Sequence, residues 1–173
     1  MICPFSQYHK TPHFEKTKML ASVVVIHYTQ TFSLQDALSI LDTRKLSAHF
    51  ILDEKGRIIQ LVDTEEKAWH AGESSFRGRK NLNDFSIGIE LVNPGFLKDE
   101  TQWSFGYRNH LGKNWANWPD SQIKSLCTLL TWIKKNHSAC ADVVGHSDVS
   151  PGRKIDPGPT FPWGKVRKHM ISQ

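Results

Sequence analysis

The chain reads VVGHSDVSPGRKIDPGP over residues 143–159, and the rest of the sequence can be organised around this stretch. A short apolar run ends at Gly145, and the chain then passes through turns at residues 151–152 and 156–158. Proline fixes φ and glycine permits positive φ, so these positions predict irregular turns in which no helix forms. The loop also carries one imidazole, two carboxylates, an arginine and a lysine. Such groups on a rigid loop after a strand predict a site for ligand binding or acid–base chemistry.

The composition is that of one globular domain. The chain has 173 residues, of which 39% are hydrophobic and 23% charged, and this length fits a single core. We expect one domain over residues 1–173, with an irregular arm at residues 1–20. The formal net charge of +5 favours acidic partners, but the basic residues are dispersed among acidic ones, so we expect no nucleic-acid partner. Cys3, Cys127 and Cys140 form no CxxC pair, which argues against a disulfide scaffold or a cysteine-rich zinc module.

The sequence shows no segment typical of membrane insertion or export. No stretch approaches the roughly eighteen apolar residues of a membrane span, and the first ten residues lack a charged segment followed by an apolar one. We therefore expect neither a signal peptide nor a transmembrane helix, and a cytoplasmic monomer. If the sequence is a piece of a longer protein, a periplasmic or envelope-associated location is the alternative.

Apolar periodicity predicts a central sheet. Four runs rich in β-branched or alternating apolar residues read as strands: residues 21–27, 47–52, 57–62 and 85–92. The first run is continuous, which predicts a strand buried on both faces and ending at His27. The second and third form a plausible hairpin. In the fourth, Ser86, Gly88 and Glu90 share the less apolar face.

Two segments have helical spacing, residues 33–41 and 119–136. Ser33 can cap the first helix, and Asp36 in its first turn suits the helix dipole. Between the last strand and the second helix, residues 93–119 form a long aromatic connection, and connections of this length are usually functional or unsettled. Strands interleaved with helices predict an α/β domain, a central mixed β-sheet flanked by helices.

Two histidines stand where side chains from distant parts of the chain can meet. His27 and His146 each end an apolar run and enter a loop. Two imidazoles and one carboxylate form the ligand set of a catalytic zinc ion, which keeps one position open for water. Asp156 is the candidate carboxylate because the Pro-Gly turn after it can aim its side chain. Asp148 competes with it, and spacing does not decide between them.

A zinc hydrolase also needs a proton carrier and a cation near the reacting carbonyl. Glu90, on the less apolar face of its strand, is our candidate general base and acid, although pairing with a nearby Lys or Arg explains it equally well. Lys154, two residues before Asp156, can stabilise developing negative charge. A solvent-exposed loop lysine is the plain alternative.

Five ordered blocks carry a family resemblance: VIHYT at 25–29, SAHF at 47–50, AWHAG at 68–72, NDFSIGIE at 83–90, and residues 145–158. Together they resemble the motifs of the type-2 N-acetylmuramoyl-L-alanine amidases, zinc enzymes that include AmpD and AmiD proteins and are related to the peptidoglycan recognition proteins. Residues 93–95, the aromatic connection after them and residues 158–163 look closer to AmiD than to AmpD. The resemblance implies a peptidoglycan-recognition-like fold, zinc bound by His27, His146 and Asp156, and catalytic roles for Glu90 and Lys154.

The implied reaction is hydrolysis of the amide between the lactyl group of N-acetylmuramic acid and L-alanine of the stem peptide, in peptidoglycan or its muropeptide fragments. We expect substrate contacts from Trp69, His70, Ala71 and Asn93. His49 and His70 are expected to organise the pocket or the sheet and not to bind metal. A peptidoglycan-binding module without catalysis is the rival, against which the complete set of ligand and catalytic residues argues. A zinc peptidase would show a helical HExxH, which is absent.

Overall fold

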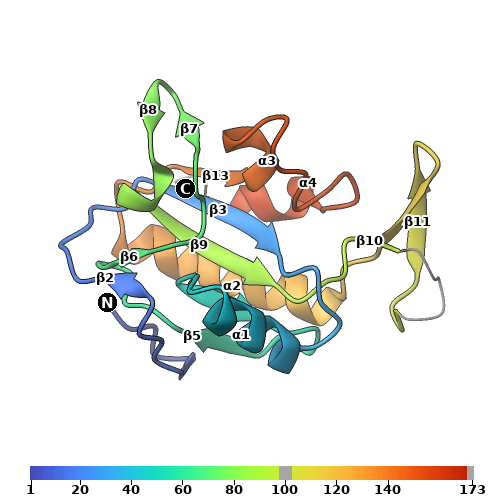
Figure 1. The fold of residues 1–173 in the computed structure, drawn as a ribbon, viewed down its shortest axis with the longest axis horizontal. Coiled ribbons are helices and arrows are strands. Elements are labelled where there is room, and N and C mark those ends of the chain that lie inside the picture. The colour runs from blue at the N-terminus through green and yellow to red at the C-terminus, as the bar shows by residue number, and fades with distance from the viewer. Residues whose placement is uncertain (98–102, 171–173) are drawn as a thin grey trace.

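The computed structural model describes residues 1–97 and 103–170 (Figure 1). Its centre is a six-stranded sheet in the order β1-β5-β4-β9-β3-β13. β4 and β5 pair antiparallel, and the other neighbours pair parallel. In sheet order the strands are β1 (Gln7–Tyr8), β5 (Ile58–Gln60), β4 (Phe50–Leu52), β9 (Ser86–Leu91), β3 (Val23–Tyr28) and β13 (Asp142–Gly145). The predicted mixed sheet, including the β4–β5 hairpin, is therefore confirmed.

Helices cover both faces of this sheet (Figure 1). They are α1 (Leu34–Thr43), α2 (Asp120–Asn136), α3 (His146–Val149) and α4 (Trp163–Val166), with short 3-10 helices η1 (Leu82–Asp84) and η3 (Arg167–Met170). Ser33 caps α1 as predicted, because its hydroxyl accepts a hydrogen bond from the backbone N–H of Asp36 at 3.1 Å. Among the described residues, no helix has both the length and the apolar composition to cross a membrane.

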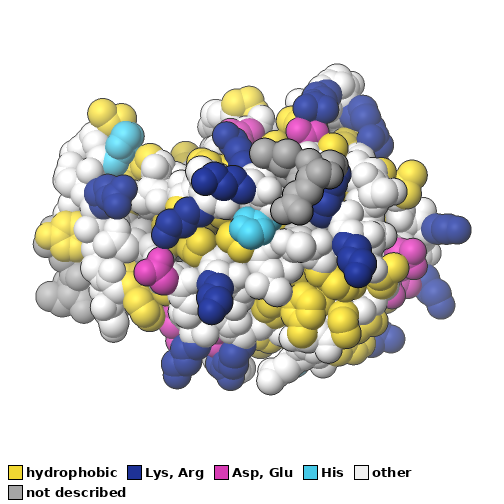
Figure 2. All heavy atoms as spheres, turned by 180° about the vertical axis from the view of Figure 1, so that it is seen from behind, with side chains coloured by type: hydrophobic (Ala, Val, Ile, Leu, Met, Phe, Trp, Pro, Cys, Tyr) yellow, Lys and Arg dark blue, Asp and Glu magenta, His cyan; other side chains and the backbone are white. Residues whose placement is uncertain are grey.

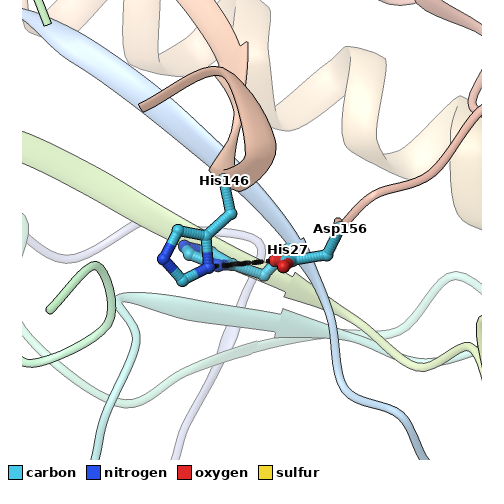
Figure 3. A group of neighbouring side chains, drawn as sticks. All are labelled: His27, His146 and Asp156. Atoms are coloured by element: carbon cyan, nitrogen blue, oxygen red, sulfur yellow. Dashed lines mark hydrogen bonds and ion pairs between the residues drawn. The ribbon is translucent and has the colours of Figure 1, made fainter. Parts of the chain in front are cut away.

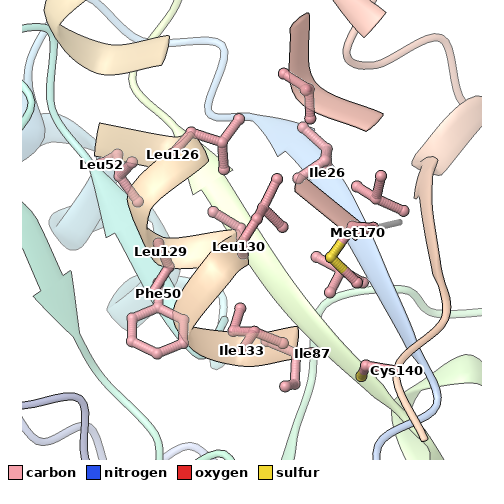
Figure 4. Close-up of a cluster of buried hydrophobic side chains, with 14 of the residues drawn as sticks. Ile26, Phe50, Leu52, Ile87, Leu126, Leu129, Leu130, Ile133, Cys140 and Met170 are labelled. Carbon is pink, nitrogen blue, oxygen red and sulfur yellow. The ribbon is translucent and has the colours of Figure 1, made fainter. Parts of the chain in front are cut away.

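The main core lies between the sheet and α2 (Figure 4). Alternate residues of β3 and β9 point into it, and they meet the apolar stripe of the helix. Its members include Val24, Ile26, Ile87, Ile89, Leu126, Leu129, Leu130 and Ile133, all fully or nearly fully buried. His27 and Glu90 are register partners on the neighbouring parallel strands β3 and β9, so their side chains point to one face. That face is opposite to α2, on the side that α1 covers.

Three segments in which no strand was predicted contain short strands, so the expectation of an irregular arm at residues 1–20 is wrong in detail. The arm at residues 1–20 contributes β1, the edge of the main sheet, and β2 (Phe14–Glu15), which pairs with β6 (Lys67–Ala68). The segment after β6 contains the hairpin of β7 (Ser75–Phe76) and β8 (Arg79–Lys80). Strands this short pair through the backbone, and two residues leave no side-chain period to detect.

The third segment is the aromatic connection, whose described part forms a three-stranded antiparallel sheet beside the body (Figure 1). Its strands are β10 (Phe96–Leu97), β11 (Tyr107–His110) and β12 (Lys113–Ala116). A single helical turn, α3, also forms within the 143–159 stretch, where no helix was expected. It ends at Val149, before the proline at 151, so the irregular turns begin only after it.

On one face of the molecule, the basic side chains do not gather in one patch. Figure 2 shows the face opposite to that of Figure 1, where Lys and Arg side chains are spread among polar and hydrophobic ones. This distribution agrees with the dispersed charge of the sequence.

Candidate metal centre and its cleft

Three side chains converge at one edge of the sheet (Figure 3). His27 comes from the end of β3, His146 opens α3 directly after β13, and Asp156 comes from the following loop. The Nδ1 atoms of the two histidines lie 2.9 Å apart, and each lies 3.1 Å from Oδ2 of Asp156. Because β3 and β13 are parallel neighbours with Ile26 opposite Gly145, their ends bring the two imidazoles together. The three buried side chains form a group that can hold a metal ion.

The outward-facing bonds show which nitrogens carry hydrogen. Nε2 of His146 lies 2.9 Å from the backbone oxygen of Ala71, and a carbonyl oxygen only accepts. The Arg153 guanidinium, which only donates, lies farther from Nε2, at 3.3 Å. The shorter contact assigns the hydrogen to Nε2 of His146, so its Nδ1 presents a lone pair to the centre. Burial lowers the pKa of His27 to about 4, so this imidazole is neutral near pH 7. Burial alone would raise the pKa of Asp156, but the imidazoles of His146 and His27 beside it hold that pKa well below the usual range.

The centre therefore combines two neutral imidazoles with one carboxylate. Lone pairs this close repel one another unless a cation lies among them. Nitrogen and carboxylate donors are the ligands that catalytic zinc takes from proteins, with three protein ligands as the common number. The donor set thus fits the metal that the family resemblance implies.

Glu90 and Lys154 lie in the cleft beside this group. A cavity of about 320 Å³ is lined by His27, Glu90, Lys154 and Asp156. Burial, followed by the charge of Asp156, raises the pKa of Glu90 to about 8, and Lys154 partly offsets this rise. Oε2 of Glu90 is buried without a hydrogen-bond partner, and no ion pair joins Glu90 to any residue that the structure describes. The Lys or Arg pairing considered for Glu90 is not found there.

The sequence matches a known protein family and individual members of it. The model for N-acetylmuramoyl-L-alanine amidase matches residues 17–159. The chain belongs to the N-acetylmuramoyl-L-alanine amidase family. AmiD of Escherichia coli K12 is 40% identical over 157 residues, which are 86% of this chain and 53% of AmiD. AmpD of Haemophilus influenzae is 33% identical over 177 residues, 89% of this chain and 86% of AmpD. The chain thus spans about half the length of AmiD.

Solved structures agree with this membership. AmiD from E. coli, in complex with the substrate anhydro-N-acetylmuramic acid-L-Ala-D-γ-Glu-L-Lys, has a TM-score of 0.75 at 36% identity. The match covers 91% of this chain and 60% of that one. An AmpD structure has a TM-score of 0.72 at 26% identity and covers 97% of this chain and 96% of its own. The family resemblance seen in the sequence is confirmed.

In this amidase-family chain, Asp148 does not reach the two histidines of the candidate centre. Its Oδ2 accepts a hydrogen bond of 2.8 Å from the backbone N–H of Gly145, at the start of α3. The carboxylate therefore satisfies an N-terminal N–H of the helical turn. Of the two carboxylates that spacing left open, the fold brings only Asp156 to the imidazoles.

The residues expected to contact substrate lie in different surroundings. His70 lines the cavity. Trp69 is half-buried, and its backbone N–H bonds to the hydroxyl of Ser47. Ala71 and Asn93 are fully buried. The backbone oxygen of Ala71 accepts from His146, and the side-chain amide of Asn93 bonds to backbone groups. Substrate contact at Ala71 or Asn93 stays a prediction, and their burial does not favour it.

His49 was expected to organise the pocket or the sheet, and its hydrogen bonds join parts of the sheet. Its Nε2 donates to the backbone oxygen of Glu66 at 2.9 Å, and its Nδ1 accepts from the N–H of Gly88 at 2.9 Å. Burial lowers its pKa to about 4. This neutral ring joins β9 to the segment before β6, and both of its nitrogens are occupied.

Several residues around the centre were not found from the sequence. The guanidinium of Arg153 donates to the backbone oxygens of Ala71 and Glu73, both at 2.6 Å, and so fixes the carbonyl that orients His146. Arg44, at the C-cap of α1, lines the cleft. The sequence around Arg44 does not reveal that this end of α1 faces the distant loop of the metal centre. Ser86 did leave a signal, because strand alternation already placed it on the face of Glu90.

Proposed function

We propose that the chain is a zinc-dependent N-acetylmuramoyl-L-alanine amidase. Its substrate would be peptidoglycan or muropeptide fragments, cleaved between the lactyl group of N-acetylmuramic acid and L-alanine of the stem peptide. The observation that supports this proposal is that His27, His146 and Asp156 converge in one cleft. Beside them lies Glu90, a carboxylate without an ion pair among the described residues. The names of the relatives support the bond, and AmiD in complex with an anhydromuramyl peptide supports the substrate class.

In this proposal His27, His146 and Asp156 hold the zinc ion. When bound, zinc polarises a carbonyl oxygen and makes water a stronger acid near neutral pH. Glu90 accepts the proton of the attacking water and returns it to the leaving amine of L-alanine. Its raised pKa suits both steps, because a group that titrates near the working pH can take up and release a proton.

Lys154 and the cleft wall complete the proposed site. Lys154 lines the same cavity as Glu90, where its ammonium can stabilise negative charge on the carbonyl oxygen of the scissile bond. The cavity also has Arg44 and Arg153 on its wall. Three cations around the cleft suit a substrate whose stem peptide carries carboxylates.

The test is mass spectrometry of the products from purified muropeptides, with and without a chelator. We expect a free stem peptide beginning with L-alanine and a sugar product, with one water added across the two. Chelation should abolish the reaction and added zinc should restore it. Intact substrate in the presence of protein shown to contain zinc would favour the binding module, and cleavage that persists after chelation would exclude zinc catalysis. Parallel digestion of intact peptidoglycan would show whether polymer or fragments are preferred.

A further inference from the structure

Behind His27, a chain of hydrogen bonds leads away from the centre. Nε2 of His27 lies 3.0 Å from Nδ1 of His70. Nε2 of His70 lies 3.2 Å from the hydroxyl of Ser86, and that hydroxyl donates to the backbone oxygen of Leu82 at 2.5 Å. Three side chains from β3, the segment after β6, and β9 are thus joined end to end, and the chain finishes on a group that only accepts.

The terminal carbonyl sets the direction of every bond in this chain. The oxygen of Leu82 cannot donate, so the single hydrogen of the Ser86 hydroxyl points to it. The Ser86 oxygen must then accept from Nε2–H of His70. A neutral His70 consequently offers an unprotonated Nδ1, which can only accept from Nε2–H of His27. The remaining nitrogen of His27, Nδ1, is left with a lone pair directed at the centre.

The fold is shaped to hold the His70 ring in this chain. A Cβ at residue 88 would lie 2.4 Å from Cγ of His70 and 2.6 Å from its Nδ1, so only glycine leaves room for the ring against β9. The rings of His27 and His70 meet edge to face, with centroids 5.2 Å apart. Three alternate positions of β9 therefore have different roles on one face. Ser86 supplies the acceptor for His70, Gly88 leaves space for the His70 ring, and Glu90 supplies the carboxylate in the cleft.

We propose that His70 and Ser86 are positioning residues that fix the tautomer of His27, so that its Nδ1 is free to bind the metal. The inference rests on the proposed metal site, because it assigns a purpose to the orientation of one ligand. The two histidines are then oriented by different means. His146 is held by the backbone oxygen of Ala71, whereas His27 depends on side chains that substitution can remove. Outer hydrogen bonds of this kind typically change metal affinity by about 10–100-fold.

The first test compares two substitutions of similar size, His70→Asn and His70→Leu. Asparagine can place its Oδ1 near the position of Nδ1 and still accept from Nε2–H of His27, whereas leucine cannot. Zinc affinity of the full chain, measured by competition with a chelator of known affinity, should fall about 10–100-fold in His70→Leu and only a few-fold in His70→Asn. Thermal unfolding of both variants after chelation reports whether the substitutions disturb the fold.

The second test reads the tautomer directly. Long-range ¹H–¹⁵N NMR of the full chain labelled in histidine identifies which nitrogen of each ring carries hydrogen. In the wild type we expect hydrogen on Nε2 of His27 and on Nε2 of His70. In Ser86→Ala, which removes one hydroxyl from a buried strand, we expect the His27 signal to report a mixture of tautomers and zinc to bind more weakly.

The proposal is overturned if His70→Leu binds zinc within about threefold of the wild type, or if His27 keeps its tautomer unchanged in Ser86→Ala. Equal loss of affinity in His70→Asn and His70→Leu would also overturn it, because packing and not the acceptor would then matter. Failure of the wild-type chain to bind zinc would instead contradict the proposed function. A wild type that binds zinc without cleaving muropeptides would leave the positioning role intact while removing catalysis.

Discussion

Gly88→Ala should damage the protein through a single contact, that of the new methyl group with the His70 ring. The methyl carbon would lie 2.4 Å from Cγ, whereas ordinary contact begins at 3.4 Å, so the ring must retreat by roughly 1 Å. The hydrogen bond of 3.0 Å between Nδ1 of His70 and Nε2 of His27 would then be lost. Gly88 does not have a positive φ, so the backbone itself accommodates alanine.

The expected cost follows from two effects. Forcing one methyl group into a packed site typically costs about 1–3 kcal/mol. An unpaired buried N–H on His27 adds about 1–3 kcal/mol where water cannot replace the lost partner. Together the two effects give about 2–6 kcal/mol, and the lower value applies where water replaces the lost partner. At a urea m-value of about 2 kcal/mol per molar, a loss of about 2 kcal/mol lowers the unfolding midpoint by about 1 M.

The assay is a double-mutant cycle in urea at pH 7, with chelator present so that metal binding does not contribute to stability. We expect Gly88→Ala to cost at least about 2 kcal/mol in the wild type and less than about 0.5 kcal/mol in a His70→Ala background, where the ring is gone. Sites that do not interact usually add within about 0.3–0.5 kcal/mol. An equal cost in both backgrounds would therefore refute the ring clash as the cause.

Three further results are expected. Glu90→Gln should keep bound zinc, counted by metal analysis, while amide hydrolysis falls roughly a hundredfold or more because the proton carrier is lost; turnover near that of the wild type would exclude Glu90 from proton transfer. Asp156→Ala should release the metal, whereas the matched Asp148→Asn should retain it and lose only about 1 kcal/mol of unfolding free energy; the reverse pattern would move the ligand to Asp148. Burial lowers the pKa of His49 from 6.5 to about 4. The unfolded chain therefore binds a proton at His49 more readily than the folded chain does. The stability that neutral His49 contributes is complete above pH 6.5 and is lost as the pH falls toward 4. Urea unfolding at pH 7 and pH 5 should show a smaller pH difference in His49→Gln, and an unchanged difference would place the proton uptake elsewhere.

Local pattern predicted the elements whose side chains repeat. The continuous apolar run of β3, the alternation of β9 and the apolar stripe of α2 each extend over enough residues to show a period, and each was found. The Ser33 cap was found because it depends on atoms three residues apart. β1, β2 and the β10–β12 sheet were missed, because short strands are held by backbone pairing with partners far along the chain.

The candidate centre was also predicted only in part from the sequence. The sequence by itself determined which residue types could bind a metal and, through strand alternation, that Glu90 faces away from the α2 core. The family motifs singled out Asp156, whereas spacing favoured it but left Asp148 open. Only the tertiary structure turned Asp148 back toward Gly145 and brought Asp156 within 3.1 Å of both imidazoles. Only the tertiary structure, too, joined His27 to His70 and Ser86. The physical reason is that sequence spacing fixes the face on which a side chain lies, whereas distances between separate loops depend on how strands pair and pack.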